Sequence, residues 1–347
     1  MQVKLKSLLK ERRVKEVILI LLFCFFALSF TLTYFLTPFI ANKMRKMNKM
    51  GVDFHKLNKP LIPEMGGLAI LTSIIISSSI LALFKILNQT VISSFMLTIL
   101  LVGLIGVIDD LKPLNPRLKP VLTALASIPI ILFNAYDPRP YLPFVGKVRL
   151  TLLYPLLIPF GIAVPANAVN MMDVFNGVMP GTCSIISLTA LIALIILGRV
   201  NEAFLPAILL GSLIAFYLYN KFPAKVFSGD VGSLTVGAAL GAIAILTKIE
   251  VIMVIALMPH IMNAFYGLSS IGRLYERREI KSRPIKLLED GRLAANIDEK
   301  APITLSRIIL AQEPLTEKQV AYIIMFLTLA SSILAVLTLV FIKVGVF

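Results

Sequence analysis

Ten long apolar segments constrain this chain more than any other feature of its sequence. A helix needs about 20 consecutive, mostly apolar residues to cross the hydrocarbon core of a bilayer. Of the 347 residues, 58% are hydrophobic and only 15% are charged, whereas soluble proteins have about 25% charged residues. The sequence therefore predicts an all-α polytopic membrane protein with about ten transmembrane helices, at residues 17–40, 65–84, 92–108, 119–133, 151–169, 178–197, 203–219, 232–246, 251–270 and 320–342.

The basic residues are divided unequally between the two sides of this predicted bundle. Of the 34 Lys and Arg residues, 21 fall in the odd-numbered connections between the segments. Because basic loops stay on the cytoplasmic side, we expect these connections in the cytoplasm. We expect the protein itself in the cell membrane or the endoplasmic reticulum membrane. The six basic residues of the N-terminal tail would then lie outside. We expect this tail to lie as an amphipathic helix on anionic lipid headgroups.

The predicted bundle forms one transmembrane domain over residues 1–347, and its longest polar connection covers residues 271–319. This connection carries ten Lys and Arg residues. We expect it to form a small cytoplasmic cap between the ninth and tenth helices, with a short helix near residues 304–311.

Two adjacent acids, Asp109 and Asp110, end the third apolar segment. The helix dipole disfavours negative charge at a C-terminus, and neighbouring carboxylates repel each other, so we infer a cation nearby. Arg117 and Lys119 follow within ten residues. Acids that can hold a divalent metal beside bases that can hold phosphate oxygens suit a nucleotide-diphosphate site. The alternative is a juxtamembrane patch with internal salt bridges.

A row of polar residues ends the fifth apolar segment. Asn167, Asn170 and Asp173 follow one another at three-residue spacing, which places them on one face of a helix. Polar side chains at a membrane helix end are costly unless they face partners, ligand or water. The row thus favours a binding site over polar contacts between helices.

Two further odd-numbered connections carry an acid beside an apolar segment. Lys59 and Glu64 lie in a turn rich in Pro and Gly. The other lysines of residues 41–64 are mostly expected to contact lipid headgroups. Asp230 lies just before the eighth segment, where a carboxylate is a favourable N-cap. Since all these clusters share one membrane face, we expect chemistry on a phosphorylated molecule at the lipid surface.

Four stretches in this order resemble the polyprenyl-phosphate N-acetylhexosamine-1-phosphate transferase family. They are KPLIPEMGG, GVIDDLKPLNPRLK, NAVNMMDVFNG and YNKFPAKVFSGDVGSL, and the resemblance covers residues 40–285. The Pro63-Glu64 pair, the spacing from Asp110 to Lys119 and the absence of a triple-His motif are similar to the eukaryotic and archaeal UDP-GlcNAc:dolichyl-phosphate branch. Asp173 is more similar to the bacterial peptidoglycan branch.

The resemblance implies a Mg²⁺-dependent enzyme, with Mn²⁺ as a substitute metal. It would transfer GlcNAc-1-phosphate from UDP-GlcNAc to a membrane polyprenyl (dolichyl) phosphate and release UMP, the first step in building lipid-linked oligosaccharides for N-glycans. The alternative within the family is transfer of phospho-N-acetylmuramoyl-pentapeptide or another UDP-hexosamine. The expected partners are the UDP-sugar, the lipid phosphate and the membrane, without nucleic acid, and a homodimer stays open.

The resemblance also assigns residues to the reaction. Asp230 and Asn170 match positions that hold the metal, and Lys119 matches a residue that contacts the diphosphate. Asp109 and Asp110 would position Lys119 or the acceptor phosphate, or act as a weak base. Phe227 matches a residue that stacks on uracil. Asn176 and Asn220 match residues near the nucleotide, and Arg283 matches a sugar-recognising basic residue. From their positions at the ends of apolar segments, we also expect Lys59, Glu64, Asn167 and Asp173 to bind substrate.

A secondary transporter is the main alternative from another functional class. Transporters place polar residues near the bilayer midplane, at broken helices in repeated halves. In this sequence the acids lie at the ends of apolar segments, and no internal repeat is apparent. We therefore favour the enzyme.

Overall fold

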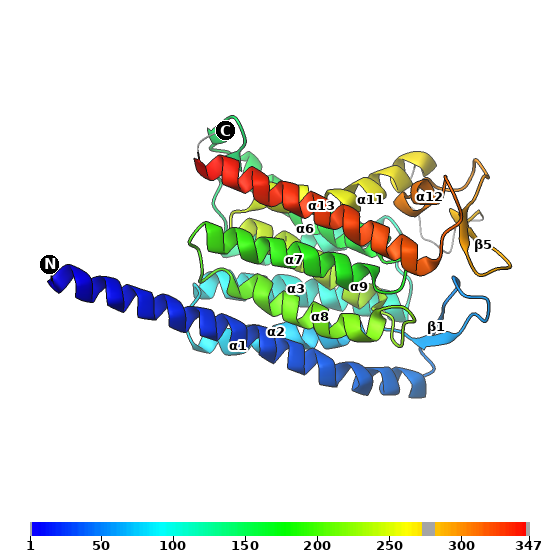
Figure 1. Ribbon diagram of the computed structural model, residues 1–347, viewed down its shortest axis with the longest axis horizontal. Coiled ribbons are helices and arrows are strands. Elements are labelled where there is room, and N and C mark those ends of the chain that lie inside the picture. Colours follow the sequence, from blue (N-terminus) through cyan, green and yellow to red (C-terminus); the bar gives the residue numbers. More distant parts are fainter. Residues whose placement is uncertain (1, 273–281, 345–347) are drawn as a thin grey trace.

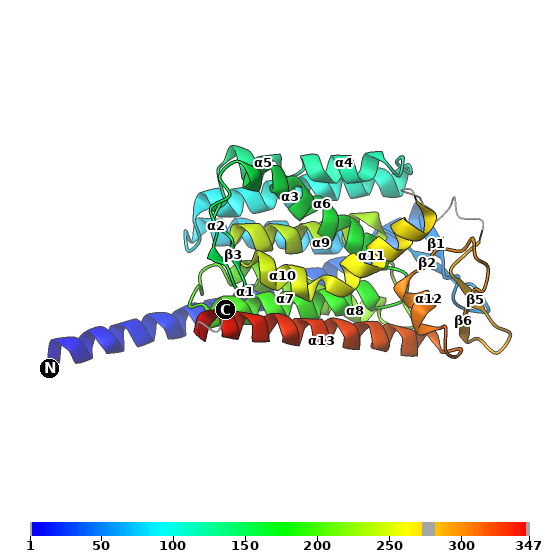
Figure 2. The ribbon, with the colours of Figure 1, turned by 90° about the horizontal axis from the view of Figure 1, so that it is seen from above.

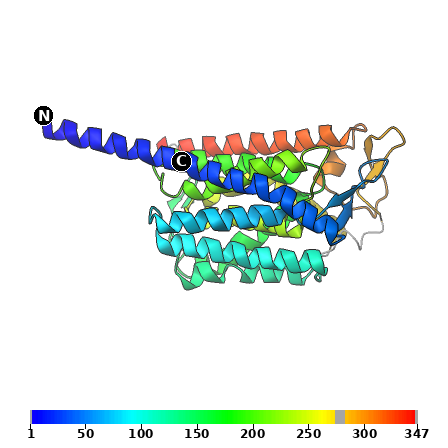
Figure 3. The same cartoon turned by 90° about the horizontal axis from the view of Figure 1, so that it is seen from below.

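The helices of the protein run side by side and form an elongated bundle (Figure 1). The computed structural model describes residues 2–272 and 282–344, with side chains from residue 16 onward. The first helix extends beyond the bundle at its N-terminal end (Figure 3). The opposite end of the bundle carries two hairpins, at residues 50–63 and 285–295, and a short helix at residues 305–309 (Figure 2). This end is called the hairpin end below.

The helices of the described residues are α1 (Gln2–Lys46), α2 (Gly67–Leu83), α3 (Gln89–Leu111), α4 (Leu118–Leu125), α5 (Ile128–Leu132), α6 (Leu153–Met172), α7 (Val178–Ile196), α8 (Phe204–Asn220), α9 (Gly229–Leu246), α10 (Glu250–Ala256), α11 (Met258–Ile271), α12 (Leu305–Ile309) and α13 (Glu317–Val344). Three antiparallel hairpins lie in the connections: β1 (Met50–Val52) with β2 (Leu61–Pro63), β3 (Tyr141–Leu142) with β4 (Gly146–Lys147), and β5 (Ile285–Leu287) with β6 (Leu293–Ala295).

Every predicted apolar segment coincides with a helix or a broken pair of helices, and the chain is a polytopic membrane protein. Among the described residues, however, only six helices are long and apolar enough to cross a membrane, or seven if the bent pair α10–α11 is one span. The expected number of about ten crossings is therefore not confirmed. Two predicted segments are each divided, one into α4 and α5 and the other into α10 and α11. Proline explains both breaks, because Pro129 and Pro259 lie in the first turns of α5 and α11 and cannot donate the backbone hydrogen bond that would continue the preceding helix.

The connection at residues 271–319 contains β5, β6 and α12. Helix α12 lies within the stretch where a short helix was expected. The basic residues Arg273, Arg277, Arg278 and Lys281 of this connection lie outside the described residues, as do the side chains of the basic N-terminal tail.

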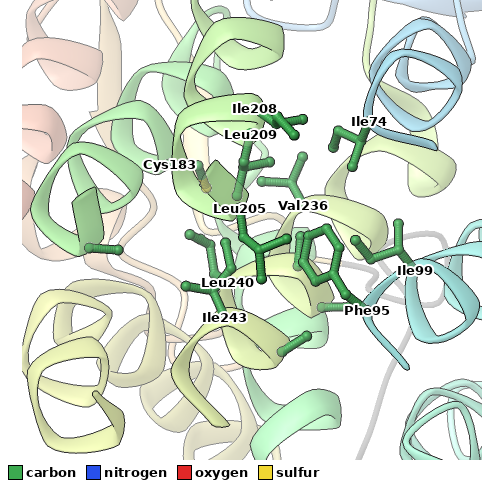
Figure 4. Close-up of a cluster of buried hydrophobic side chains, with 14 of the residues drawn as sticks. Ile74, Phe95, Ile99, Cys183, Leu205, Ile208, Leu209, Val236, Leu240 and Ile243 are labelled. Atoms are coloured by element: carbon green, nitrogen blue, oxygen red, sulfur yellow. The ribbon is translucent and has the colours of Figure 1, made fainter. Parts of the chain in front are cut away.

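Helix α9 lies at the centre of the bundle. Its membrane-crossing stretch is 89% buried, and it packs mainly against α3 and α6. Figure 4 shows Val236, Leu240 and Ile243 of α9 among apolar side chains such as Phe95 of α3 and Leu205 of α8. A helix that is apolar on all sides belongs inside a bundle. The first residues of α9, including Asp230, are therefore held from several directions.

Small residues let the backbones around α9 approach closely. A Cβ atom on Gly67 of α2 would lie 2.1 Å from the Cα of Gly232, and one on Gly237 would lie 2.3 Å from the carbonyl oxygen of Pro165 in α6. Packing of this kind replaces the hydrophobic effect as a source of helix association in membranes. It fixes α2 and α6 relative to the start of α9.

We predict that Gly237→Ala destabilises the protein, because its methyl group would meet backbone that cannot move aside. The free energy of unfolding should fall by about 1–3 kcal/mol, measured as a lower melting temperature in detergent. Gly161→Ala is the matched control at the same α6–α9 contact, since its Cβ would meet mainly the tip of the Ile245 side chain, at 2.9 Å. Equal melting temperatures for the two variants would contradict the close-packing argument.

Candidate active site

Five of the predicted site residues come together at the hairpin end of the bundle. They are supplied by the C-terminal ends of α3 and α6 and the N-terminal ends of α4 and α9, and those helices lie next to one another in Figure 2. We call them the aspartate cluster: Asp109, Asp110, Lys119, Asn170 and Asp230.

Asp110 binds the N-terminus of α9. Its Oδ1 accepts a hydrogen bond from the backbone N–H of Asp230 at 2.7 Å, and its Oδ2 accepts one from Val231 at 3.0 Å. The first N–H groups of a helix have no partner within the helix, and the helix dipole favours negative charge there. The cation expected near Asp110 is thus the positive end of a helix. Asp230 itself lies inside the first turn of α9, which begins at Gly229, and Ser228 is the N-cap residue, so the alternative interpretation of Asp230 as the N-cap does not hold.

Asp109 forms a buried ion pair with Lys119. Its Oδ1 also accepts a hydrogen bond from the backbone N–H of Leu114 at 2.7 Å. The Lys119 ammonium lies 3.2 Å from Oδ2 of Asp230. Lys119 therefore bridges Asp109 and Asp230. Of the two adjacent acids, it is Asp109 and not Asp110 that pairs with Lys119.

Asp230 is the more open of the two aspartates that Lys119 contacts. Its side chain is 30% exposed, against 2% for Asp109. The Asn170 amide nitrogen donates to Oδ1 of Asp230, and also to the hydroxyl of Ser233 at 2.8 Å. Carboxylate and amide oxygens are ligands that Mg²⁺ accepts. The partly open carboxylate fits a divalent cation, and Asn170 would present its oxygen to it after a half-turn of the amide.

The other two members of the polar row on α6 contact different elements. The Asn167 amide donates to the hydroxyl of Thr123 in α4 at 3.0 Å and to the carbonyl of Ala163 at 2.8 Å. Asp173 accepts a hydrogen bond from the hydroxyl of Ser228, which precedes α9. Asp173 follows the last residue of α6 as its C-cap, and the Asn167 contacts are those of a link between helices.

Asn176 belongs to a second group of polar side chains, which we call the polar junction: Asp53, Lys56, Asn176 and Glu317. The Asn176 side-chain oxygen accepts from the Lys56 ammonium at 2.8 Å and from the backbone N–H of Ala224 at 2.7 Å. Its backbone N–H donates to Glu317 at 2.9 Å. The junction joins the turn before β2, the start of α13 and the loop that carries Phe227.

The sequence reasoning missed Asp53, Lys56 and Glu317. Lys56 was expected on lipid headgroups, yet it forms ion pairs with Asp53 and with Glu317, both buried. Glu317 follows Lys56 by 261 residues, so no local pattern could have connected them. An acid in the first turn of a helix such as α13 also has an ordinary explanation in the helix dipole.

The polar junction has a geometry that a metal could use. One ligand atom each from Asp53, His55 and Glu317 lies within 4.8 Å of the others. The Lys56 ammonium, however, already bridges the two carboxylates. We therefore infer that Lys56, rather than a metal ion, supplies the positive charge in this group.

Asn220 is the last residue of α8, and Phe227 lies in the loop between α8 and α9. The Asn220 side chain accepts from the N–H of Gly177 at 3.0 Å and donates to the carbonyl of Val226 at 2.9 Å. The Phe227 backbone forms 2.8 Å hydrogen bonds with Pro63 and Gly66 on either side of Glu64. These contacts hold the half-buried Phe227 against the turn that contains Glu64.

Lys59 and Arg283 lie apart from the aspartate cluster. Both line a cavity of about 410 Å³ between the turn at residues 54–59 and the strand β5. The Arg283 guanidinium stacks 4.0 Å above the centre of the Phe54 ring. None of the residues that line this cavity belongs to the aspartate cluster, so their predicted contact with the same substrate remains a prediction.

A family model described as "Glycosyl transferase family 4" matches residues 91–248, a range that contains the whole aspartate cluster. A provisionally named glycosyltransferase of Methanocaldococcus jannaschii is 31% identical over 317 residues, which cover 91% of this chain and 96% of that protein. The chain belongs to glycosyl transferase family 4.

Other relatives of this chain have names that give different substrates. A protein of Saccharolobus solfataricus is 32% identical over 72% of this chain and 82% of its own length, and is provisionally named a UDP-N-acetylglucosamine–dolichyl-phosphate N-acetylglucosaminephosphotransferase. A phospho-N-acetylmuramoyl-pentapeptide-transferase of Citrifermentans bemidjiense is 31% identical over 70% of this chain and 76% of its own length. The comparisons support an enzyme that transfers a phosphate-containing group, and so disfavour the transporter.

We predict that Asp110→Ala destabilises the fold, because two N–H groups at the start of α9 lose their acceptors. Leaving a buried donor without a partner costs about 1–3 kcal/mol, so the melting temperature should fall measurably. Lys112→Ala, an exposed change two residues away, is the control and should melt like the unaltered protein. If Asp110→Ala also melted normally, the proposed anchoring of α9 would be wrong.

Proposed function

We propose that the protein transfers GlcNAc-1-phosphate from UDP-GlcNAc to a membrane polyprenyl phosphate of the dolichyl type, with release of UMP. One observation carries the proposal: the aspartate cluster places a lysine between two aspartates at a membrane helix end, with one carboxylate partly open. The family to which the chain belongs and the names of its relatives support this reaction. The product would be a polyprenyl diphosphate sugar.

The chemistry is a displacement at phosphorus. An oxygen of the polyprenyl phosphate attacks the sugar-bearing phosphorus of UDP-GlcNAc, and the bond from that phosphorus to the oxygen of the departing UMP breaks. Negative charge grows on that oxygen, and stabilising such charge is the main task of the protein in phosphoryl transfer. Lys119, held by Asp109, supplies a fixed positive charge for it. A divalent cation at Asp230 and Asn170, when bound, adds charge neutralisation of the diphosphate.

The acceptor needs little help from a base. The second pKa of a phosphate monoester is about 6, so most of the acceptor is already a dianion near neutral pH. Asp109 and Asp110 are therefore positioning residues, the first for Lys119 and the second for α9. A direct displacement suffices, without a covalent aspartyl intermediate.

The nucleotide would lie over the loop between α8 and α9. The Phe227 ring is half-buried and its backbone is fixed on both sides, which makes it a rigid surface for the uracil ring. Asn220 fixes the same loop, so we assign it a positioning role rather than direct contact. We place this end of the bundle in the cytoplasm because the odd-numbered connections carry most of the basic residues.

A second substrate pair is favoured by a specific observation. The relative named phospho-N-acetylmuramoyl-pentapeptide-transferase is nearly as similar to this chain as the relative named for UDP-GlcNAc. Asp173, which resembles the bacterial branch, lies beside the aspartate cluster through Ser228. The displacement would be the same with either UDP-sugar.

The proposal is tested by incubating the purified protein with radiolabelled UDP-GlcNAc, dolichyl phosphate and Mg²⁺. We expect UMP and a radiolabelled sugar that extracts with the lipid. A parallel reaction contains UDP-N-acetylmuramoyl-pentapeptide and undecaprenyl phosphate, and product there alone would select the second substrate pair. Failure to form a lipid-linked product from any UDP-hexosamine would overturn the proposed function.

In this assay we predict that Asp230→Ala lowers turnover by about 100-fold or more, as loss of a group that stabilises transition-state charge does. The melting temperature should change little, because the side chain is partly exposed. Asp290→Ala, an exposed acid after β5, is the control and should keep full activity. Near-normal turnover of Asp230→Ala would refute the assigned role.

We predict that Phe227→Ala weakens UDP binding by about 5- to 150-fold, the range expected for loss of one base–aromatic stack. Isothermal titration of the purified protein with UDP measures this directly. Phe265→Ala, an exposed change on α11, controls for general effects of removing a ring. Equal UDP affinities for the two variants would count against stacking.

A further inference from the structure

A second cavity lies at the end of the bundle away from the aspartate cluster. Its volume is about 400 Å³. Its walls come from the segment before β3, the strands β3 and β4, the link between α9 and α10, the residues that follow α7 and the last turns of α13. Figure 2 shows β3 near the end of α13, far from β1 and α12. The proposed transfer reaction makes no use of this cavity.

Basic side chains outnumber acidic ones around this cavity. The four basic residues that line it are Arg139, Lys147, Arg199 and Lys248. The two acids that line it are Asp137 and Glu250. Glu250 accepts a hydrogen bond from the hydroxyl of Tyr154 on α6, so one of its contacts is made to the bundle rather than to the basic residues.

Asp137 is shared by two of the basic residues. Arg139 Nε lies 2.9 Å from one carboxylate oxygen, and Lys248 Nζ lies 2.8 Å from the other. The hydrogen bond from Arg139, helped by that from Lys248, lowers the pKa of Asp137 to about 2. The carboxylate is therefore ionised at neutral pH, and its single charge balances only one of the two cations.

The remaining two basic residues leave a positive charge at the rim. Arg199 pairs with Glu202 at 3.2 Å, and it also donates to the carbonyl of Thr247 at 2.5 Å. Within the described residues, no carboxylate oxygen lies within 4 Å of the exposed Lys147 ammonium. An anion at the rim would thus meet Lys147 and the incompletely balanced pair on Asp137.

The inner wall of the same cavity is apolar. It is formed by Ile249 and Ile252 at the start of α10 and by Leu339 and Ile342 in the last turns of α13. Because α13 is long and apolar enough to cross the membrane, its last turns lie near the membrane surface. Basic pockets between membrane helices attract anionic lipid headgroups. A free anion would gain nothing from the apolar wall, whereas an acyl chain would.

We propose that this cavity binds an anionic phospholipid. Its phosphate would lie among Arg139, Lys147 and Lys248, and an acyl chain would lie against α10 and α13. The bound lipid would tie the segment at residues 137–147, which contains β3 and β4, to the bundle. The chain alone makes this link partly through the ion pair between Asp137 and the exposed Lys248, and such pairs contribute little to stability. The proposal is independent of the proposed transferase reaction.

The test uses the full chain, purified in a neutral detergent, and measures its melting temperature against ligand concentration. Dioctanoyl phosphatidylglycerol should raise the melting temperature in a saturable way, because a ligand that binds only the folded state stabilises it. Dioctanoyl phosphatidylcholine and inorganic phosphate are the two comparison ligands. An equal rise with phosphatidylcholine would overturn the requirement for negative charge, and an equal rise with inorganic phosphate would overturn the assignment to a lipid.

The site is located with the double variant Lys147→Gln, Lys248→Gln. Each basic side chain near an anionic lipid contributes about a fivefold gain in affinity, so the phosphatidylglycerol concentration at half-saturation should rise about 30-fold. Lys85→Gln changes an exposed lysine between α2 and α3 and should respond like the unaltered protein. If the double variant does not fold, Lys147→Gln alone is used, with an expected rise of about fivefold. An unchanged half-saturation in the variant would show that the lipid binds elsewhere, and would overturn the proposal.

Discussion

The candidate site depends on the contact between Asp110 and the first backbone amides of α9. Through it the end of α3 holds the start of the helix that is most enclosed by the rest of the bundle. A carboxylate and the positive end of a helix satisfy each other's charge and hydrogen bonds, which matters most where little water is present. Glycine contacts along α9 hold the same helix against α2 and α6. Asp230 is positioned as a result of both.

Each acid of the aspartate cluster is stabilised in a different way, and the role that we propose for each follows from this difference. Asp110 binds backbone amides, and Asp109 binds a buried lysine. Asp230 shares that lysine with Asp109 but keeps an open side, which is where we propose that a divalent cation binds. The polar junction follows the same principle, since Lys56 forms ion pairs with two buried carboxylates there. Buried acids of this kind are tolerated in a membrane protein only when they are paired.

Much of the candidate site was predictable from sequence, because its residues lie at the ends of apolar segments and a helical face can be read from spacing. Asn170 and Asp173 both contact residues at the start of α9, as their spacing at the end of α6 suggested, and Asp109, Lys119 and Asp230 meet. Lys59 and Arg283 line another cavity, and their contact with the same substrate stays a prediction. Their position depends on how the hairpins fold over the bundle, which no local pattern specifies.

The sequence by itself determined that the chain is a helical membrane protein with its polar motifs at helix ends, because apolar length and three-residue spacing are local properties. Only the tertiary structure decided which charges meet. It gave Asp110 a helix end as its partner and joined Lys56 to Glu317. These outcomes depend on the packing of helices that are more than a hundred residues apart in the chain, and on the need to pair every buried charge once they are packed.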